Sequence, residues 1–235
     1  FSEIELRACP RCGVSIAVCQ MNQAGFTGST AVYFIRSLRD QQTDVTLNSN
    51  CMMCGRCLEV CPVGIDTLGL RVGARSVDNK QVVADFSYLL KQPVESKKAE
   101  VVYFAGCMGH LTPGVKNAMC QIFEKAGINY SFFDQDGSIC CGRPLKLAGL
   151  EESALKLVSE NTRKLIDTQA KILVTSCPIC YKIFNSDYDL KGMKVFHHSV
   201  YINNLIQEGK LTLQPAGLRA VYHDPCELGR GSGIY

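Results

Sequence analysis

Fourteen cysteines in a chain of 235 residues, most of them in tightly spaced groups, constrain this sequence more than any other feature. The tightest group follows the pattern C-x2-C-x2-C-x3-C-P and consists of Cys51, Cys54, Cys57, Cys61 and Pro62. Two-residue spacers let one short loop wrap three thiolates around a common centre, while the fourth thiolate, on the following helical turn, points away. In a chain of ordinary globular composition, such spacing favours metal ligation in a reducing compartment over disulfides. We therefore expect a cytoplasmic location.

An earlier segment repeats this run without gaps, because residues 9–19 align with residues 51–61. The earlier copy keeps three of the four cysteines, namely Cys9, Cys12 and Cys19. At the remaining position it has Ser15, where the later copy has Cys57. Runs of the later type bind [4Fe–4S] clusters in bacterial ferredoxins, and residues 1–75 resemble a two-cluster module of that kind.

In such a module the fourth cysteine of each run serves the opposite cluster. Cluster A is accordingly assigned to Cys9, Cys12, Ser15 and Cys61. Cluster B is assigned to Cys19, Cys51, Cys54 and Cys57. We expect a [4Fe–4S] cluster at each site, with iron bound through these residues. Zinc is the alternative, although this spacing is not typical of structural zinc sites.

Ser15 leaves the type of cluster A open. The site would hold either a [4Fe–4S] cluster with a serine alkoxide or a water on one iron, or a [3Fe–4S] cluster that lacks this iron. An alkoxide is a harder donor than a thiolate and should favour the more oxidised cluster, whereas a three-iron cluster should have a higher potential. Cluster A is therefore expected to differ from cluster B.

Five further cysteines form a second set, in the later part of the chain. They are Cys107, Cys140, Cys141, Cys177 and Cys180. Cys107 and Cys177 each follow a predicted strand directly, and the adjacent pair lies in a loop after another strand. Ligands of α/β domains usually bind at the carboxyl ends of strands. Thiolates from three loops are therefore expected to converge on one site.

This second set, with Gly142 and Pro178 and the gaps between them, resembles the cysteine-rich CCG domain. That domain occurs in heterodisulfide reductase subunits (B/C or D type) and in the iron–sulfur subunits of glycolate oxidase and anaerobic glycerol-3-phosphate dehydrogenase. The resemblance implies that the five cysteines hold a noncubane [4Fe–4S] cluster. The alternatives are another iron–sulfur cluster, zinc, or no metal at all.

A second internal repeat aligns residues 101–107 with residues 220–226, so Cys226 corresponds to Cys107. Residues 216–235 then look like the start of a second CCG domain, in which Cys226 would be a ligand of an incomplete site. We expect further residues, or a partner chain, to complete that domain. The expected order is a ferredoxin-like module (1–75), a linker that includes a connecting helix (76–98), a first CCG domain (99–215) and this second beginning.

Alternating strand and helix patterns predict a mainly parallel sheet in the region from residue 99 onward. The predicted strands are 101–105, 130–133, 171–175 and one that starts at 219–222. The predicted helices are 113–126, 150–168 and 199–207. With a mainly α-helical N-terminal module, the expected fold class is α+β overall, with an α/β CCG domain.

Several other residues invite a functional interpretation, but most have a plainer one. Cys120 is expected to be a core thiol, and His197 and His198 are expected to be structural. His110 and His223 each lie three residues from a predicted ligand and would tune a cluster if they approach it. Arg143, beside the paired cysteines, would offset cluster charge.

The sequence favours an electron-relay subunit of a multi-subunit oxidoreductase. A net charge of +3 is too weak to suggest nucleic-acid binding, and no apolar run is long enough for a membrane span. No G-x-G-x-x-G motif follows a strand, so we expect a flavin or nicotinamide to belong to a partner and predict a flavoprotein subunit. Any membrane association is expected to be made through partner subunits. The alternatives are a catalytic disulfide or heterodisulfide reductase subunit and a zinc-bound scaffold without redox activity.

Overall fold

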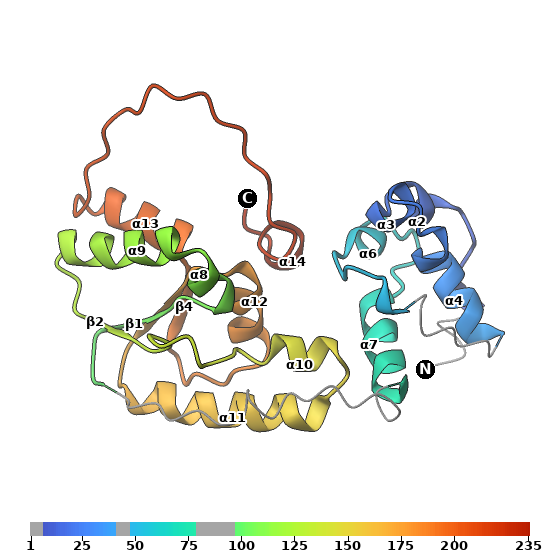
Figure 1. The fold of residues 1–235 in the computed structure, drawn as a ribbon, viewed down its shortest axis with the longest axis horizontal. Helices are drawn as coiled ribbons and strands as arrows, with labels where there is room; N and C mark the ends of the chain where they lie inside the picture. The colour runs from blue at the N-terminus through green and yellow to red at the C-terminus, as the bar shows by residue number, and fades with distance from the viewer. Residues whose placement is uncertain (1–6, 41–47, 79–96) are drawn as a thin grey trace. The chain divides into compact units, whose positions relative to one another are not determined.

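The computed structural model describes residues 7–40, 48–78 and 97–235 (Figure 1). These residues form two compact units. The first comprises the described residues up to 78 together with 144–151 and 229–234, and the second comprises 97–143, 152–228 and Tyr235. The connecting helix expected within residues 76–98 lies largely outside the described residues, and the expected domain boundaries stay predictions.

The first unit is built from short helices around a small apolar core. Its helices include α2 (Val14–Ala17), α3 (Gln20–Gln23), the 3₁₀ helix η1 (Thr27–Ser29), α4 (Ala31–Arg39), α6 (Arg56–Glu59) and α7 (Thr67–Asp78). Phe34 and Ile35 of α4 pack against Ile65 and against Leu70 of α7. Cys9 and Cys61 lie partly buried against this core, which therefore supports both cysteine runs.

The second unit is a parallel sheet with helices on both faces. Its main elements are β1 (Val101–Phe104), α8 (Cys107–Leu111), α9 (Pro113–Lys125), β2 (Tyr130–Phe132), α11 (Glu151–Asp167), β3 (Ile172–Thr175), α12 (Pro178–Ser186), β4 (Lys194–His197) and α13 (His198–Gln207). The strand order is β2-β1-β3-β4, and all three neighbouring pairs are parallel. Two further short helices, α10 (Arg143–Leu147) and α14 (Gly229–Ser232), belong almost wholly to the first unit.

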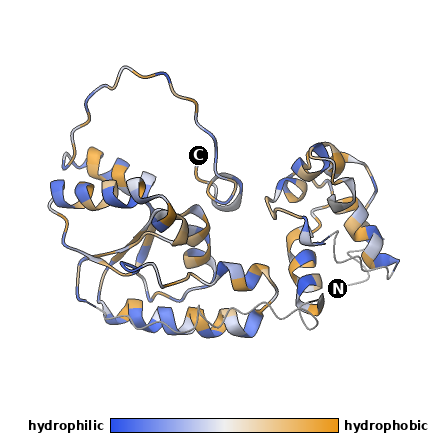
Figure 2. Ribbon diagram, viewed as in Figure 1, coloured by the Kyte–Doolittle hydropathy of each residue, from blue (hydrophilic) through white to orange (hydrophobic). Residues whose placement is uncertain are grey.

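Alternation along the central strand β1 divides the core into two layers. Val101 and Tyr103 pack against apolar side chains of α9 and α13 on one face of the sheet. Val102 and Phe104 pack against apolar side chains of α11 and α12 on the other face. Figure 2 shows the matching pattern in α11, whose ribbon carries both hydrophobic and hydrophilic residues around its axis. Every residue of β1 is buried, as a strand covered on both faces requires.

The expected fold class is confirmed, and most predicted elements are found within a residue or two of their expected bounds. The strand β4 and the helix α12 were not predicted. Leu155, Val158, Leu165 and Ile166 fit one face of the predicted helix 150–168, but only Val158 and Leu165 of these four are buried in α11, and Leu155 is 62% exposed. The buried stripe of this helix is therefore narrower than its apolar pattern predicts.

The strand predicted to start at 219–222 is wrong, because residues 211–225 contain neither helix nor strand. The segment runs as an extended loop in Figure 1, and Val221 is 97% exposed. Its apolar residues fit a strand pattern. A strand also needs a neighbour that accepts its backbone hydrogen bonds, and among the described residues the sheet ends at β2 and β4 without one.

Candidate functional site

Two loops of the same backbone shape carry the two cysteine runs of the first unit. Arg11 and Met53 both have φ of 56°, which non-glycine residues seldom adopt. Gly13 and Gly55 follow at 78° and 77°, and each leads into a four-residue helix, α2 or α6. The two copies that align in sequence therefore follow the same course in space.

One cavity of the first unit is lined by all four residues predicted for cluster A, including Ser15. It encloses about 380 Å³ of space not filled by protein atoms, counting the part open to solvent. Apolar side chains form much of the remaining wall, among them Val14, Val32, Ile35, Val60 and Ile65. Donor atoms from both cysteine runs thus meet at one enclosed, largely apolar place.

A second cavity, of about 400 Å³ by the same measure, is lined by all four residues predicted for cluster B. Cys19 comes from the first run, and the other three come from the second run. Ala31 and Cys57 line both cavities, so the two predicted cluster sites are neighbours. Arg71 of α7 also lines the second cavity.

Backbone amides point at two of the cysteine sulfurs in the second run. The amide of Met53 donates to Cys51 Sγ and the amide of Ile65 donates to Cys61 Sγ, each at 3.4 Å. Hydrogen bonds of this kind stabilise the negative charge of cluster-bound thiolates and help to set cluster potentials.

Cys57 has a side-chain partner as well, because its Sγ lies 3.1 Å from Thr67 Oγ1. Burial raises the pKa of the Cys57 thiol above its usual value, while the hydrogen bond from Thr67 and the nearby positive charge of Arg71 act in the opposite direction. Thr67 is itself almost completely buried. The contact with Thr67 therefore holds the sulfur of Cys57, the cysteine that lines both cavities.

In the second unit, the loops after β1 and β3 meet. Cys107 is the first residue of α8, and Cys177 is the residue before α12. Between β1 and Cys107, Gly106 has φ 78° and ψ 158°, a conformation largely restricted to glycine. A Cβ added to Gly106 would lie 2.9 Å from Cys177 Cβ and 3.1 Å from Cys180 Sγ. Glycine is thus required for the two loops to approach each other.

The paired cysteines lie in the loop before α10 and are both buried. Their carbonyl groups are held by residues of α11 and of the segment after α12: Asn161 Nδ2 donates to Cys140 O at 2.8 Å, and the Tyr188 hydroxyl donates to Cys141 O at 3.0 Å. The amide of Gly142 points at Cys140 Sγ, at 3.4 Å. Sequence reasoning missed Asn161 and Tyr188, because neither lies near a cysteine in the chain.

The five sulfurs of the second unit interact with one another. Hydrogen bonds from Cys140 and Cys180 lower the pKa of Cys141 well below its usual value, and a hydrogen bond from Cys180 lowers the pKa of Cys177. Cys107 is exposed as a residue, yet partial burial of its thiol and the nearby Cys141 and Cys177 raise its pKa. The structure therefore brings together all five cysteines that the sequence predicted to converge.

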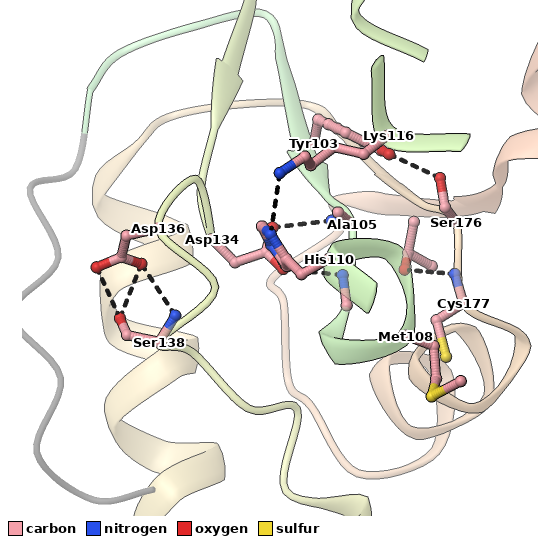
Figure 3. A network of polar contacts seen from close by, with 12 residues as sticks. Tyr103, Ala105, Met108, His110, Lys116, Asp134, Asp136, Ser138, Ser176 and Cys177 are labelled. Atoms are coloured by element: carbon pink, nitrogen blue, oxygen red, sulfur yellow. Dashed lines mark hydrogen bonds and ion pairs between the residues drawn. The ribbon is translucent and has the colours of Figure 1, made fainter. Parts of the chain in front are cut away.

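Asp134, shortly after β2, anchors the loop that leads to Cys107 (Figure 3). Its fully buried carboxylate accepts hydrogen bonds from the amides of Ala105 and Gly106, both at 2.8 Å. His110 Nε2 lies 3.2 Å from the same carboxylate, and His110 Nδ1 lies 3.3 Å from Lys116 Nζ. Burial raises the pKa of Asp134, against the effect of these amides and of His110. His110 therefore supports the loop through Asp134.

Arg143 follows the paired cysteines and forms an ion pair with Glu227, at 3.0 Å. Lys182 of α12 approaches the other oxygen of Glu227 at 2.9 Å. Burial would raise the pKa of Glu227, but Lys182 and Arg143 hold it below the usual value. The sequence predicted that Arg143 would offset cluster charge, but in the structure its positive charge is paired with the carboxylate of Glu227. Cys226 precedes Glu227 in the chain and is partly buried.

The remaining candidates have structural surroundings. Cys120 packs against the core cluster on the α9 side of the sheet, as expected for a core thiol. His197 is buried, its Nδ1 accepts a hydrogen bond at the start of α13, and burial lowers its pKa to about 4. His198 is half-buried beside it, whereas His223 is exposed.

The donor sets and the space between them suit iron–sulfur clusters. Within the part of the chain that the structure describes, no three His, Cys, Asp or Glu side chains are placed to hold a metal ion. A cluster distributes its ligands over several irons, so its thiolates surround a cavity instead of one point. The first unit has two such cavities, and in the second unit the absence of a side chain at Gly106 lets the loop of Cys107 approach Cys177 and Cys180.

Each of the two cysteine groups lies in a region that matches a known protein family. Residues 5–65 match the model of the 4Fe-4S dicluster domain, and residues 101–185 match the model of the cysteine-rich CCG domain. The chain thus carries a match to each of the two predicted domains, and the predicted resemblance to the CCG-domain iron–sulfur proteins is confirmed. The match confirms two [4Fe–4S] clusters and a further cluster in the CCG domain, and it favours iron over zinc.

Several oxidoreductase proteins are similar to this chain. A subunit of the fumarate reductase (CoM/CoB) of Methanothermobacter marburgensis is 26% identical over 98% of this chain and 53% of its own length. The D-type subunit of the dihydromethanophenazine:CoB–CoM heterodisulfide reductase of Methanosarcina barkeri is 27% identical over 79% of this chain and 54% of its own length. The EtfAB:quinone oxidoreductase of Syntrophomonas wolfei is 30% identical over 61% of this chain, but over only 21% of its own length.

The chain therefore spans about half the length of most curated relatives it matches, or less. No solved structure matches it. Their printed names are those of iron–sulfur proteins and of oxidoreductases or their subunits, which supports the electron-transfer role that the cysteine pattern predicted. Among the described residues, every helix is too short or too polar to cross a membrane.

The close approach at Gly106 yields a prediction. We expect Gly106→Ala to lower the iron content by about four atoms per chain, because the new methyl group occupies the space beside Cys177 and Cys180. Iron analysis of anaerobically purified protein measures this. Gly127→Ala is the matched control, since Gly127 also has a positive φ (+63°) but has no atom within 4 Å of an added Cβ. Full iron content in Gly106→Ala would show that this contact is not part of the site.

Proposed function

We propose that this chain relays single electrons through two neighbouring cubane sites in its first unit and a third cluster site in its CCG domain. Cys9, Cys12, Ser15 and Cys61 would bind cluster A. Cys19, Cys51, Cys54 and Cys57 would bind cluster B. Cys107, Cys140, Cys141, Cys177 and Cys180 would bind the CCG cluster.

The observation that carries this proposal is the pair of cavities in the first unit. Each is lined by one complete set of predicted ligands drawn from both cysteine runs, and the two cavities share Cys57 and Ala31. A shared wall gives a short path between the two sites. The residues around them hold sulfur atoms in place through backbone amides and Thr67, so little has to move when charge arrives.

The electron donor or acceptor on one side would be a flavoprotein subunit. Iron–sulfur clusters take up and release one electron at a time, whereas a reduced flavin releases two electrons and two protons. Two successive one-electron transfers, to two separate sites of this chain, would balance that oxidation, and the protons would pass to water. Having two adjacent sites in one unit suits this stoichiometry.

A second role remains open for the CCG domain, namely catalytic reduction of a disulfide. It is favoured by the match to the D-type heterodisulfide reductase subunit over 79% of the chain. Two electrons and two protons would convert one disulfide to two thiols. Turnover of a heterodisulfide by the complex, and its loss in Cys141→Ser while the first-unit clusters still reduce, would distinguish this role from simple relay.

The proposal predicts the iron content of the protein. If all three sites hold four-iron clusters, the chain binds about twelve irons, or about eleven if cluster A is a three-iron cluster. Iron and sulfide analysis of anaerobically prepared protein, with its visible absorbance, measures this. About eight irons or fewer would remove the CCG site from the proposal, since the two clusters of the first unit alone account for about seven or eight.

Ser15 gives a prediction about cluster A alone. We expect Ser15→Cys to make the EPR spectrum and midpoint potential of cluster A more like those of cluster B, because the substitution supplies the missing thiolate in the cavity wall. Ser37→Cys in α4 is the control, since it adds a thiol to the same unit at a residue that lines neither cavity. Identical spectra for Ser15→Cys and the parent would place residue 15 away from the cluster.

The partner is tested by purification of the native complex. We expect a flavin-containing subunit to elute with this chain, and its reduced form to bleach the visible absorbance of the clusters. The transfer should fail when the chain is replaced by Cys54→Ser, which removes one predicted cluster B ligand. A stable complex in which every subunit lacks flavin would argue for another donor, such as a cytochrome.

A further inference from the structure

Arg71, in the first turns of α7, is a charged residue with only 1% of its surface exposed. It lines the cavity formed by the predicted cluster B ligands. Its guanidinium carbon lies 4.2 Å from the centre of the Phe34 ring, a cation–π contact with the core of the unit. Asn48 fixes the backbone of the same residue by donating to Arg71 O at 3.3 Å. The arginine therefore has a defined place beside the cavity.

The charges that act on Arg71 include those of three predicted cluster B ligands and of the neighbouring Arg75. Burial lowers the pKa of Arg71, and so does the charge of Arg75. The thiolates of Cys51, Cys57 and Cys19 act in the opposite direction. A guanidinium stays protonated in proteins, so a full positive charge persists at this buried place. Three of the four predicted cluster B ligands thus interact electrostatically with the positive charge of Arg71.

Arg75, one helical turn further along α7, reinforces this arrangement. Its guanidinium donates to the carbonyl groups of Asn48 at 2.9 Å and Cys51 at 3.2 Å. It also interacts electrostatically with Cys51. Both arginines of α7 therefore act on Cys51, one of the predicted cluster B ligands.

The cavity of the predicted cluster A ligands has a different charged neighbour. The arginine that lines it is Arg11, which is exposed, so water and salt screen its charge. The same unit charge acts more strongly when it is buried, because the surrounding medium has a lower dielectric constant. The two sites, alike in backbone shape, thus differ in their electrostatic surroundings.

We propose that Arg71, together with Arg75, raises the reduction potential of cluster B above that of a four-iron cluster A, so that an electron entering the first unit settles on cluster B. Reduction adds one negative charge to a cluster and its thiolates. A fixed cation nearby stabilises the reduced form more than the oxidised form. This inference rests on the ligand assignment of the proposed function, and Arg71 acts in it as a tuning residue.

The test is an EPR-monitored redox titration of the full chain, prepared anaerobically. We expect Arg71→Gln to shift the midpoint potential of cluster B to a lower value, with a smaller shift at cluster A. Arg71→Lys, which keeps the charge, should shift it less. Arg36→Gln is the matched control, because it removes the same charge from a side chain that is 64% exposed. The signals are told apart through Ser15→Cys, which alters cluster A.

An unchanged cluster B potential in Arg71→Gln, with all first-unit irons present, would overturn the inference and leave the proposed function intact. Absence of those irons from the parent chain would instead refute the ligand assignment. If Arg71→Gln does not retain cluster B, Arg75→Gln decides the matter. A lower cluster B potential in that variant supports the arginine pair as the source of the difference, and an unchanged one overturns it.

Discussion

The structure depends on keeping thiolate sulfurs close together inside protein. Sulfurs that carry negative charge repel one another, and burial adds the cost of removing them from water. The chain meets this cost differently at each place. Backbone amides of tight loops point at Cys51, Cys61 and Cys140, a hydroxyl lies beside Cys57, and a buried arginine lines the second cavity. Gly106 lets the loop of Cys107 come close to Cys177 and Cys180. Both the backbone geometry and the compensating charges are therefore needed to keep the sulfurs together.

Spacing along the chain was sufficient to predict the ligand groups, because two-residue gaps leave a loop few ways to place its sulfurs. The same holds for the strands before Cys107 and Cys177, whose buried apolar runs end shortly before a cysteine. Residues that hold these loops from a distance could not be predicted. Asp134, Asn161 and Glu227 reach the site only through the folded sheet and its helices, so no local pattern reveals them.

One rule explains why the strand predicted at 219–222 is wrong and why the strand predicted at 101–105 is found as β1. An apolar segment forms a strand only where a neighbouring strand completes its hydrogen bonds. Val102 has β2 and β3 on either side, whereas Val221 has no strand beside it in the described chain. Likewise, β4 is short and starts with an exposed lysine, so its composition alone does not predict a strand. It forms a strand because its backbone pairs with β3.

The positive φ angles at Arg11 and Met53 have a consequence for how the protein matures. A bulky residue in this region costs about 1–3 kcal/mol, and here the cost occurs twice in a small unit. Metal–thiolate bonds offset it once iron is in place. Because metal binding and folding are coupled, the unit is expected to be less stable without iron than with its clusters in place. The strained loops thus make the stability of this unit depend on the supply of iron.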